Sequence, residues 1–117
     1  QVTDQGAREG NYLESSATAL FIYTLAKAVN KGYISKDYIE PTRKAFDGMV
    51  KTFTRLEEDG SYTITNCCAV AGLGGDSKRY RDGSFEYYIS EPVIENDPKS
   101  VGSFILAAIE YEKMTDK

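Results

Sequence analysis

The amino-acid sequence predicts a mainly α-helical domain, and three observations lead to that prediction. Apolar residues recur at helical spacing in three segments, and one Asp-Gly dipeptide lies between two short runs typical of a β-hairpin. A further stretch of about thirty residues has no regular period, and long irregular segments in small domains are usually functional. The predicted helices cover about residues 13–31, 35–53 and 97–114, the hairpin covers 54–66, and the irregular segment follows the hairpin.

The first predicted helix has apolar residues on more than one side. It carries no charged residue between Ala17 and Ala26, and a helix that is apolar nearly all round is buried on both sides. Lys27 and Lys31 near its end suit the negative pole of the helix dipole, and Gly32 is a typical stop. We therefore expect this helix to lie between two packed layers.

The second predicted helix is amphipathic instead. Ser35 is a good N-cap, and we expect Pro41 to kink the helix or to delay its regular start. Charged residues occupy one side of this helix, so that side is expected to meet solvent. The expected buried face consists of Tyr38, Thr42, Ala45, Phe46, Met49, Val50 and Phe53.

The last predicted helix has its own start signal. Asp97 suits the N-cap, and Pro98 suits the first helical position. The helix is expected to end near Met114. Its expected apolar stripe consists of Val101, Phe104, Ile105, Ala108 and Ile109.

Composition excludes several classes of function. The chain has 117 residues, a formal net charge of −4, and a hydrophobic share of 41%. These values indicate one folded domain or part of one, and the acidic balance argues against nucleic-acid binding. No apolar run is long enough to span a membrane. The chain starts without Met, so we expect a piece of a longer protein, whose cellular compartment stays open.

The residues that are missing restrict the chemistry further. The chain contains no His, so it cannot build a Ser-His-Asp or Cys-His catalytic site or offer a His ligand to a metal. Its two cysteines, Cys67 and Cys68, are neighbours and lie too close for a relaxed disulfide. Carboxylates are therefore the only candidate acids, and no metal site is expected.

Small polar residues open the first predicted helix. Glu14, Ser15 and Ser16 precede its apolar part, and a helix start of this kind can face a cavity with its free N–H groups. The alternative interpretation is close packing of the helix through small side chains, together with N-capping. Both interpretations remain open on the sequence alone.

The irregular segment combines aromatic and charged residues. Tyr87 and Tyr88 follow Glu86, and aromatic faces stack on sugar rings while carboxylates bind sugar hydroxyls. The alternative is that one tyrosine packs inward with its hydroxyl satisfied. Arg81 suits a carboxylate ligand, but it could equally pair with Asp82 or Glu86 and only hold the loop.

Several stretches of the chain resemble the unsaturated rhamnogalacturonyl hydrolases, which form glycoside hydrolase family 105. The resemblance covers nearly the whole chain and is most specific in the irregular segment. The stretches that carry it are NYLESSATA at 11–19, VAGLGG at 70–75, YRDGSFEYYISEPV at 80–93 and NDPKSVG at 96–102.

The resemblance implies an (α/α)6 barrel, in which an inner ring of helices lies inside an outer ring. A helix that is buried on both sides, followed by an amphipathic helix, agrees with that architecture. Three predicted helices, a hairpin and a long loop make up only part of such a barrel. We therefore expect residues 1–117 to be the C-terminal part of a single barrel domain, with the N-terminal remainder of the same protein as its partner.

The resemblance also implies a reaction. Enzymes of this family remove a 4,5-unsaturated galacturonic acid from the non-reducing end of pectin fragments, without a metal or cofactor. A general-acid Asp protonates the C4=C5 bond and water adds at C5. That Asp lies in the N-terminal part of the family, so no residue here is predicted to be catalytic and this chain alone is expected to be inactive.

Residues of family-typical sequence are the candidates for binding the oligosaccharide substrate. They are Glu14, Ser15, Ser16, Arg81, Glu86, Tyr87, Tyr88 and Glu91. Two alternatives to this function stay open. One is an unsaturated glucuronyl hydrolase that acts on glycosaminoglycan-type disaccharides, and the other is a non-catalytic helical module that binds carbohydrate or a protein partner.

Overall fold

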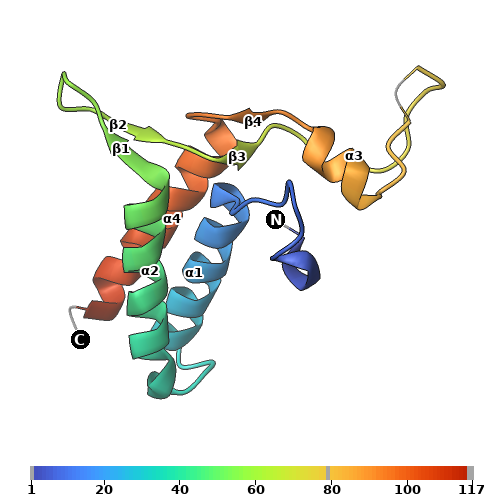
Figure 1. Cartoon of the computed structure of the whole chain (residues 1–117). Coiled ribbons are helices and arrows are strands. Elements are labelled where there is room, and N and C mark those ends of the chain that lie inside the picture. The colour runs from blue at the N-terminus through green and yellow to red at the C-terminus, as the bar shows by residue number, and fades with distance from the viewer. Residues whose placement is uncertain (1, 79, 116–117) are drawn as a thin grey trace.

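The computed structural model describes residues 2–78 and 80–115, and its main body is a bundle of helices (Figure 1). Helix α1 (Ser15–Asn30) and helix α4 (Pro98–Thr115) run in the same direction, and helix α2 (Ile39–Phe53) runs opposite to both. This arrangement confirms the mainly helical prediction. Short 3-10 turns, η1 (Thr3–Gln5) and η2 (Lys36–Tyr38), precede α1 and α2.

Short strands lie at one end of the bundle. Strands β1 (Thr54–Leu56) and β2 (Tyr62–Ile64) form the predicted antiparallel hairpin, with Thr54 opposite Ile64. Gly60 adopts a φ of 85° in the connecting turn, a conformation that glycine tolerates without a steric cost. The Asp-Gly signal therefore located this hairpin correctly.

The irregular segment contains more regular structure than its sequence indicates. Strand β3 (Cys67–Cys68) pairs antiparallel with β4 (Val93–Ile94), and a short helix α3 (Phe85–Ser90) lies between them in sequence. Ser84 caps α3 by accepting a hydrogen bond from the Tyr87 N–H at 3.0 Å. These elements are too short to show a hydrophobic period in the sequence.

The core lies where the three long helices meet. It consists of Ala19, Ile22, Met49, Phe53, Phe104 and Ala107, all of which are buried. Small residues bring α1 close to α4, and the hydroxyls of Ser15 and Ser100 share a buried hydrogen bond of 2.7 Å. The two helices therefore pack closely along their length, which fixes the position of both of their N-termini.

The buried face of α2 was predicted correctly at some positions and wrongly at others. On α2, Thr42, Met49 and Phe53 are buried as predicted, but Tyr38 and Val50 are exposed. Tyr38 ends the 3-10 turn η2, so the α-helix starts at Ile39, later than its Ser35 signal, as Pro41 predicts.

The apolar stripe predicted for the last helix is only partly buried. Phe104 is buried, whereas Ile105, Ala108 and Ile109 are exposed. On α1, Ile22 and Ala26 are buried, whereas Ala17, Leu20 and Phe21, on another side of the helix, are exposed. Both helices are apolar on two sides, so helical spacing alone could not identify which side meets this bundle.

None of the helices in the described part of the chain has the length and apolar character that a membrane span requires. The two cysteines of β3 are free thiols and are buried. Burial, followed by the nearby negative charges of Glu14 and Asp97, raises the pKa of Cys67 to about 11. The Cys67 thiol is therefore protonated at neutral pH.

Helix α1 starts on a buried carboxylate. Glu14 Oε2 accepts a hydrogen bond from the Ala17 N–H at 2.7 Å, and its Oε1 accepts hydrogen bonds from Ser16 and from the Cys68 N–H at 3.1 Å. Burial raises the pKa of Glu14, but these hydrogen bonds together lower it below its ordinary value. Glu14 thus ties the start of α1 to strand β3.

Replacing Glu14 with Gln is expected to destabilise the fold in a pH-dependent way. Because the pKa of Glu14 is lowered on folding, its stabilising contribution is complete above about pH 4.3 and is lost as pH falls through the lower, folded-state pKa. Glu14→Gln should cost about 1–3 kcal/mol in free energy of unfolding near pH 7 and much less in acid. Urea unfolding of the parent protein and of the Glu14→Gln variant, measured from acidic pH to pH 7, tests this prediction.

The matched control is Glu58→Gln, because Glu58 is exposed in the hairpin. This variant should unfold at the same urea concentration as the parent near neutral pH. A Glu14→Gln variant whose stability deficit is the same at neutral and acidic pH would contradict the role given to the Glu14 carboxylate.

Candidate functional site

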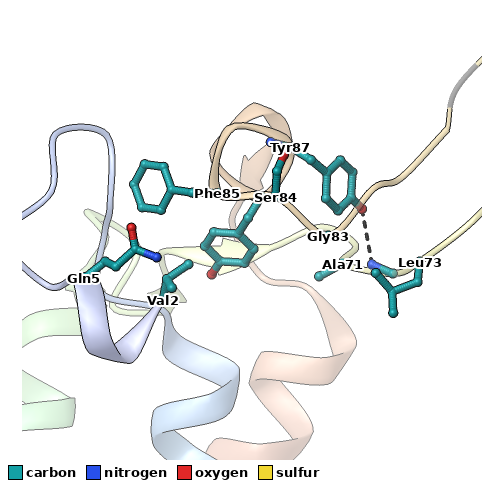
Figure 2. A pocket seen from close by; sticks show the side chains of 10 residues that line it. Val2, Gln5, Ala71, Leu73, Gly83, Ser84, Phe85 and Tyr87 are labelled. Carbon is teal, nitrogen blue, oxygen red and sulfur yellow. Dashed lines mark hydrogen bonds between the residues drawn. The ribbon is translucent and has the colours of Figure 1, made fainter.

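Two neighbouring hollows lie at the end of the bundle where α1 and α4 begin. The first has a volume of about 330 Å³ and lies between α3, the N-terminal segment and the loop after β3 (Figure 2). The second has a volume of about 310 Å³ and lies at the start of α1. Ala71 and Tyr88 line both hollows, so together the two form one candidate binding region.

The predicted residues at the start of α1 separate into two groups. Glu14 and Ser16 line the second hollow. Ser15 does not, because its side chain is fully buried against Ser100 of α4. For Ser15, the interpretation as a small residue that allows close helix packing therefore fits the structure.

Tyr88 lies between the two hollows with one face of its ring covered. It stacks on Tyr12, with ring centroids 5.6 Å apart and planes at 7°. Burial raises the pKa of both phenols, so both are neutral at physiological pH. Tyr12 was not predicted as a site residue, and the only signal for it was its place in the NYLESSATA stretch.

Tyr87 is held by its hydroxyl at the edge of the first hollow. The hydroxyl accepts a hydrogen bond from the Gly72 N–H at 3.2 Å (Figure 2). Burial, and then an interaction with the Glu91 side chain, raises the pKa of Tyr87. This contact positions the tyrosine against the loop of residues 71–74.

Glu91 is a buried carboxylate whose ionic partner is Arg81. The Glu91 side chain is 0% exposed, the Arg81 side chain is 33% exposed, and Arg81 Nε lies 3.9 Å from Glu91 Oε1. The sequence suggested Asp82 or Glu86 as the partner of Arg81, but the ion pair of Arg81 is with Glu91, and Glu86 pairs with Arg8 instead. A guanidinium carries five N–H donors, so a carboxylate on one side does not exhaust its binding capacity.

The backbone of the loop leaves room for Arg81. Gly74 and Arg81 exchange backbone hydrogen bonds of 2.8 and 2.9 Å. A Cβ atom at Gly72 would lie 3.4 Å from Arg81 Nη1, a tight contact, so the guanidinium lies directly against a residue that lines the first hollow. Arg81, Tyr87 and Glu91 therefore lie close together beside the first hollow.

Glu86 has a different environment. Its carboxylate forms an ion pair with Arg8 of the N-terminal segment, and the Arg8 guanidinium carbon lies 3.8 Å from the centre of the Phe85 ring. Glu86 lines neither hollow. It instead holds the N-terminal segment, including Val2 and Gln5, beside α3, where both residues line the first hollow.

Lys99 is a residue of the second hollow that sequence reasoning missed. Its Nζ donates to Asp97 Oδ1 at 2.7 Å and to the Ala69 carbonyl at 3.0 Å. The hydrogen bond with Asp97 raises the pKa of Lys99, so the ammonium is charged at neutral pH. The sequence contained a signal for Lys99, because a lysine in the first turn of a helix interacts unfavourably with the helix dipole and so needs another reason to be there.

Within the described residues, no cluster of three or more His, Cys, Asp or Glu side chains is arranged to hold a metal ion. The second hollow contains the Lys99 ammonium, and the Arg81 guanidinium lies beside the first hollow without lining it, so the region combines two cationic groups with hydroxyls and aromatic rings. This set of groups fits a sugar that carries a carboxylate.

Comparison with known proteins places these observations in a family. The sequence model described as Glycosyl Hydrolase Family 88 matches residues 1–115. Two curated relatives, "Protein Atu3128" of Agrobacterium fabrum (strain C58 / ATCC 33970) and the "24.9 kDa protein in picA locus" of Rhizobium radiobacter, are each 39% identical to the chain over 114 residues. Each match covers 94% of this chain and 49% of the relative, so the chain spans about half the length of these proteins.

A solved structure agrees with the sequence match. The glycoside hydrolase from family 105 of C. acetobutylicum ATCC 824 is 46% identical, with a TM-score of 0.92. The match covers 96% of this chain and 31% of that chain, and the shared backbone is consistent with the C-terminal part of an α/α barrel. From the match of its residues 1–115, we conclude that the chain belongs to glycosyl hydrolase family 88.

Proposed function

We propose that this chain is part of an enzyme that removes 4,5-unsaturated galacturonic acid from the non-reducing end of rhamnogalacturonan fragments. Family membership makes it part of a carbohydrate-processing hydrolase. The narrower substrate is supported by the resemblance of the YRDGSFEYYISEPV stretch and by 46% identity with a family 105 structure.

The proposed reaction starts with a proton transfer to the C4=C5 bond. A general-acid Asp outside this chain protonates that bond, water adds at C5, and the sugar ring opens so that the remaining oligosaccharide leaves. No group in the described residues is given a role in these steps. The part proposed for this chain is to bind and orient the sugar.

The observation that carries the proposal is the group formed by Arg81, Glu91 and Tyr87. Glu91 is buried beneath a guanidinium that remains one-third exposed, and Tyr87 is fixed beside the same loop. Arginine is suited to planar, two-point contacts with carboxylates, and an unsaturated uronic acid carries a carboxylate. We therefore assign to Arg81 the contact with the uronate group.

The remaining predicted residues receive narrower roles. Tyr88 has one ring face against Tyr12 and lines both hollows, so its accessible atoms can border a sugar. Ser16 offers its hydroxyl in the second hollow, while Glu14 maintains the helix start. Ser15 and Glu86 act in packing and in holding the N-terminal segment.

One alternative substrate is favoured by a specific observation. The sequence model that matches the chain is that of family 88. The family related to the rhamnogalacturonyl hydrolases acts on unsaturated glucuronyl residues of glycosaminoglycan-type disaccharides. Both substrates carry the same uronate carboxylate, so Arg81 would serve either one.

The two substrates can be compared directly in the complete enzyme that contains this sequence. We expect unsaturated galacturonosyl-rhamnose to be hydrolysed with the higher kcat/KM, followed through loss of the ultraviolet absorbance of the C4=C5 bond. A higher kcat/KM for the glucuronyl disaccharide would select the alternative. Absence of turnover on both would favour a non-catalytic binding module.

The 117-residue chain alone is expected to leave unsaturated galacturonosyl-rhamnose intact, because the proposed general acid lies outside it. The same absorbance assay tests this, with the complete enzyme as the positive control. Turnover by the isolated chain at a rate comparable with the complete enzyme would show that a catalytic acid is present within these residues.

Replacing Arg81 with Ala should raise KM and lower kcat/KM by roughly 10- to 150-fold, the range for loss of one charged hydrogen-bonded contact. Arg81→Ala also removes the ion pair between Arg81 and the buried Glu91 carboxylate, which lowers stability by itself. The decisive comparison is therefore made in a Glu91→Gln background, where that buried charge is absent.

Glu91→Gln alone and Arg81→Ala/Glu91→Gln should have similar thermal midpoints but different KM values. Arg43→Ala is the matched control, because Arg43 pairs with Glu40 on α2, away from both hollows. If the two background-matched proteins share the same KM and differ only in thermal midpoint, Arg81 merely supports the loop.

A further inference from the structure

The side chain of Gln5 lies on the wall of the first hollow that the N-terminal segment supplies. The backbone of this residue is held on both sides. Its N–H donates a hydrogen bond to the Val2 carbonyl at 3.2 Å. Its carbonyl accepts from the Arg8 N–H at 2.9 Å and from Asn11 Nδ2 at 2.7 Å. The Gln5 side chain therefore extends from a fixed point beside the hollow.

Arg8 determines which end of the Gln5 amide faces the hollow. Arg8 Nη1 donates a hydrogen bond of 2.7 Å to the Gln5 side chain. A guanidinium carries only donors, so the atom that it contacts must be the amide oxygen Oε1. The amide nitrogen Nε2 then lies at the other end, and Figure 2 shows the oxygen of Gln5 on the side of the Phe85 ring and the nitrogen turned away from it.

Helix α3 in turn fixes the orientation of Arg8. The Arg8 guanidinium forms an ion pair with Glu86, and its central carbon lies 3.8 Å from the centre of the buried Phe85 ring. An ion pair with 45% and 69% exposed side chains contributes little to stability by itself. A carboxylate, an aromatic face and an amide oxygen together, however, hold a planar guanidinium in one orientation.

This arrangement leaves the donors of Gln5 Nε2 available to a ligand. Within the part of the chain that the structure describes, the hydrogen bonds of Gln5 use its backbone and Oε1. The neighbouring lining residues Val2, Leu73 and Phe85 are apolar and offer no side-chain donors. Apolar surface beside a few directed polar groups is typical of a site that binds a small ligand.

We propose that Gln5 is a specificity-determining residue of the candidate region, where Nε2 donates a hydrogen bond to an uncharged oxygen of the bound oligosaccharide. Arg8 acts as its positioning residue. A neutral amide suits a sugar hydroxyl or ring oxygen, whereas the carboxylate of the sugar is assigned to Arg81. This inference rests on the proposed function, because it takes the oligosaccharide substrate as the ligand.

The first test is Gln5→Met in the complete enzyme, which keeps the length of the side chain and removes both donors. We expect KM for unsaturated galacturonosyl-rhamnose to rise roughly 3- to 10-fold, the range for one neutral hydrogen bond. The value of kcat should stay the same, because Gln5 is given no contact with the reacting bond. An unchanged KM would overturn the proposal.

The matched control is Thr3→Val. Thr3 lies in the same 3-10 turn η1, is exposed and does not line the first hollow. This variant should keep the parent KM. A rise in KM equal to that of Gln5→Met would show that any change in the turn disturbs binding, and would overturn the specific role of Gln5.

The second test asks whether Arg8 acts through Gln5. Arg8→Met should raise KM, because the amide can then turn its oxygen toward the sugar, whereas Arg8→Lys keeps a charged donor and should stay closer to the parent. In a Gln5→Met background, Arg8→Met should raise KM no further, even where it lowers the thermal midpoint. An equal rise in both backgrounds would overturn the positioning role of Arg8.

The parent enzyme separates failure of this inference from failure of the proposed function. If it hydrolyses the unsaturated glucuronyl disaccharide instead, the proposed substrate is wrong, and the Gln5 and Arg8 variants are compared on that disaccharide. If it hydrolyses neither, calorimetric binding of the same two disaccharides replaces KM. Absence of binding would then overturn this inference together with the proposed function.

Discussion

The close approach of α1 and α4 is the constraint on which the rest of the structure depends. Ser15 and Ser100 share a buried hydrogen bond, and small residues such as Ala19 and Ala107 leave no space between the two helices. Both helices therefore begin at the same end of the bundle, beside β3. Glu14, at the start of α1, then joins the helix to that strand through the Cys68 N–H. The candidate binding region is built on this fixed end.

Much of the fold could be predicted because its signals are local. The Asp59-Gly60 turn, the delayed start of α2 at Pro41 and the Pro98 start of α4 each depend on a few neighbouring residues. The β3–β4 pairing could not be predicted, because it joins two-residue strands that are distant in sequence. The buried side of α4 was also missed, since a helix that is apolar on two sides does not indicate which side meets which partner.

The candidate site likewise combines features that could be predicted from the sequence with contacts that could not. Residue types singled out Arg81, Tyr87 and Glu91 as binding candidates, and the structure brings these side chains together, while their role in binding stays a prediction. The partner of Arg81 was not predictable, because Glu91 becomes a buried neighbour only when α3 places it under the loop. The burial of Ser15 and the pairing of Glu86 with Arg8 depend on contacts between residues that are distant in sequence, so no local pattern predicts them. Sequence thus identifies chemical groups more readily than the surfaces they occupy.

The reactivity of the Cys67 thiol in β3 can be used to measure local opening of this part of the fold. Cys67 is fully buried, and with its pKa raised to about 11 only roughly one thiol in ten thousand is ionised at neutral pH. An alkylating reagent would therefore modify Cys67 mainly when β3 separates from β4 and the side chain reaches water. The rate of alkylation would then follow the local opening of this strand pair, at the point where α1, α4 and the loop that carries Arg81 are joined.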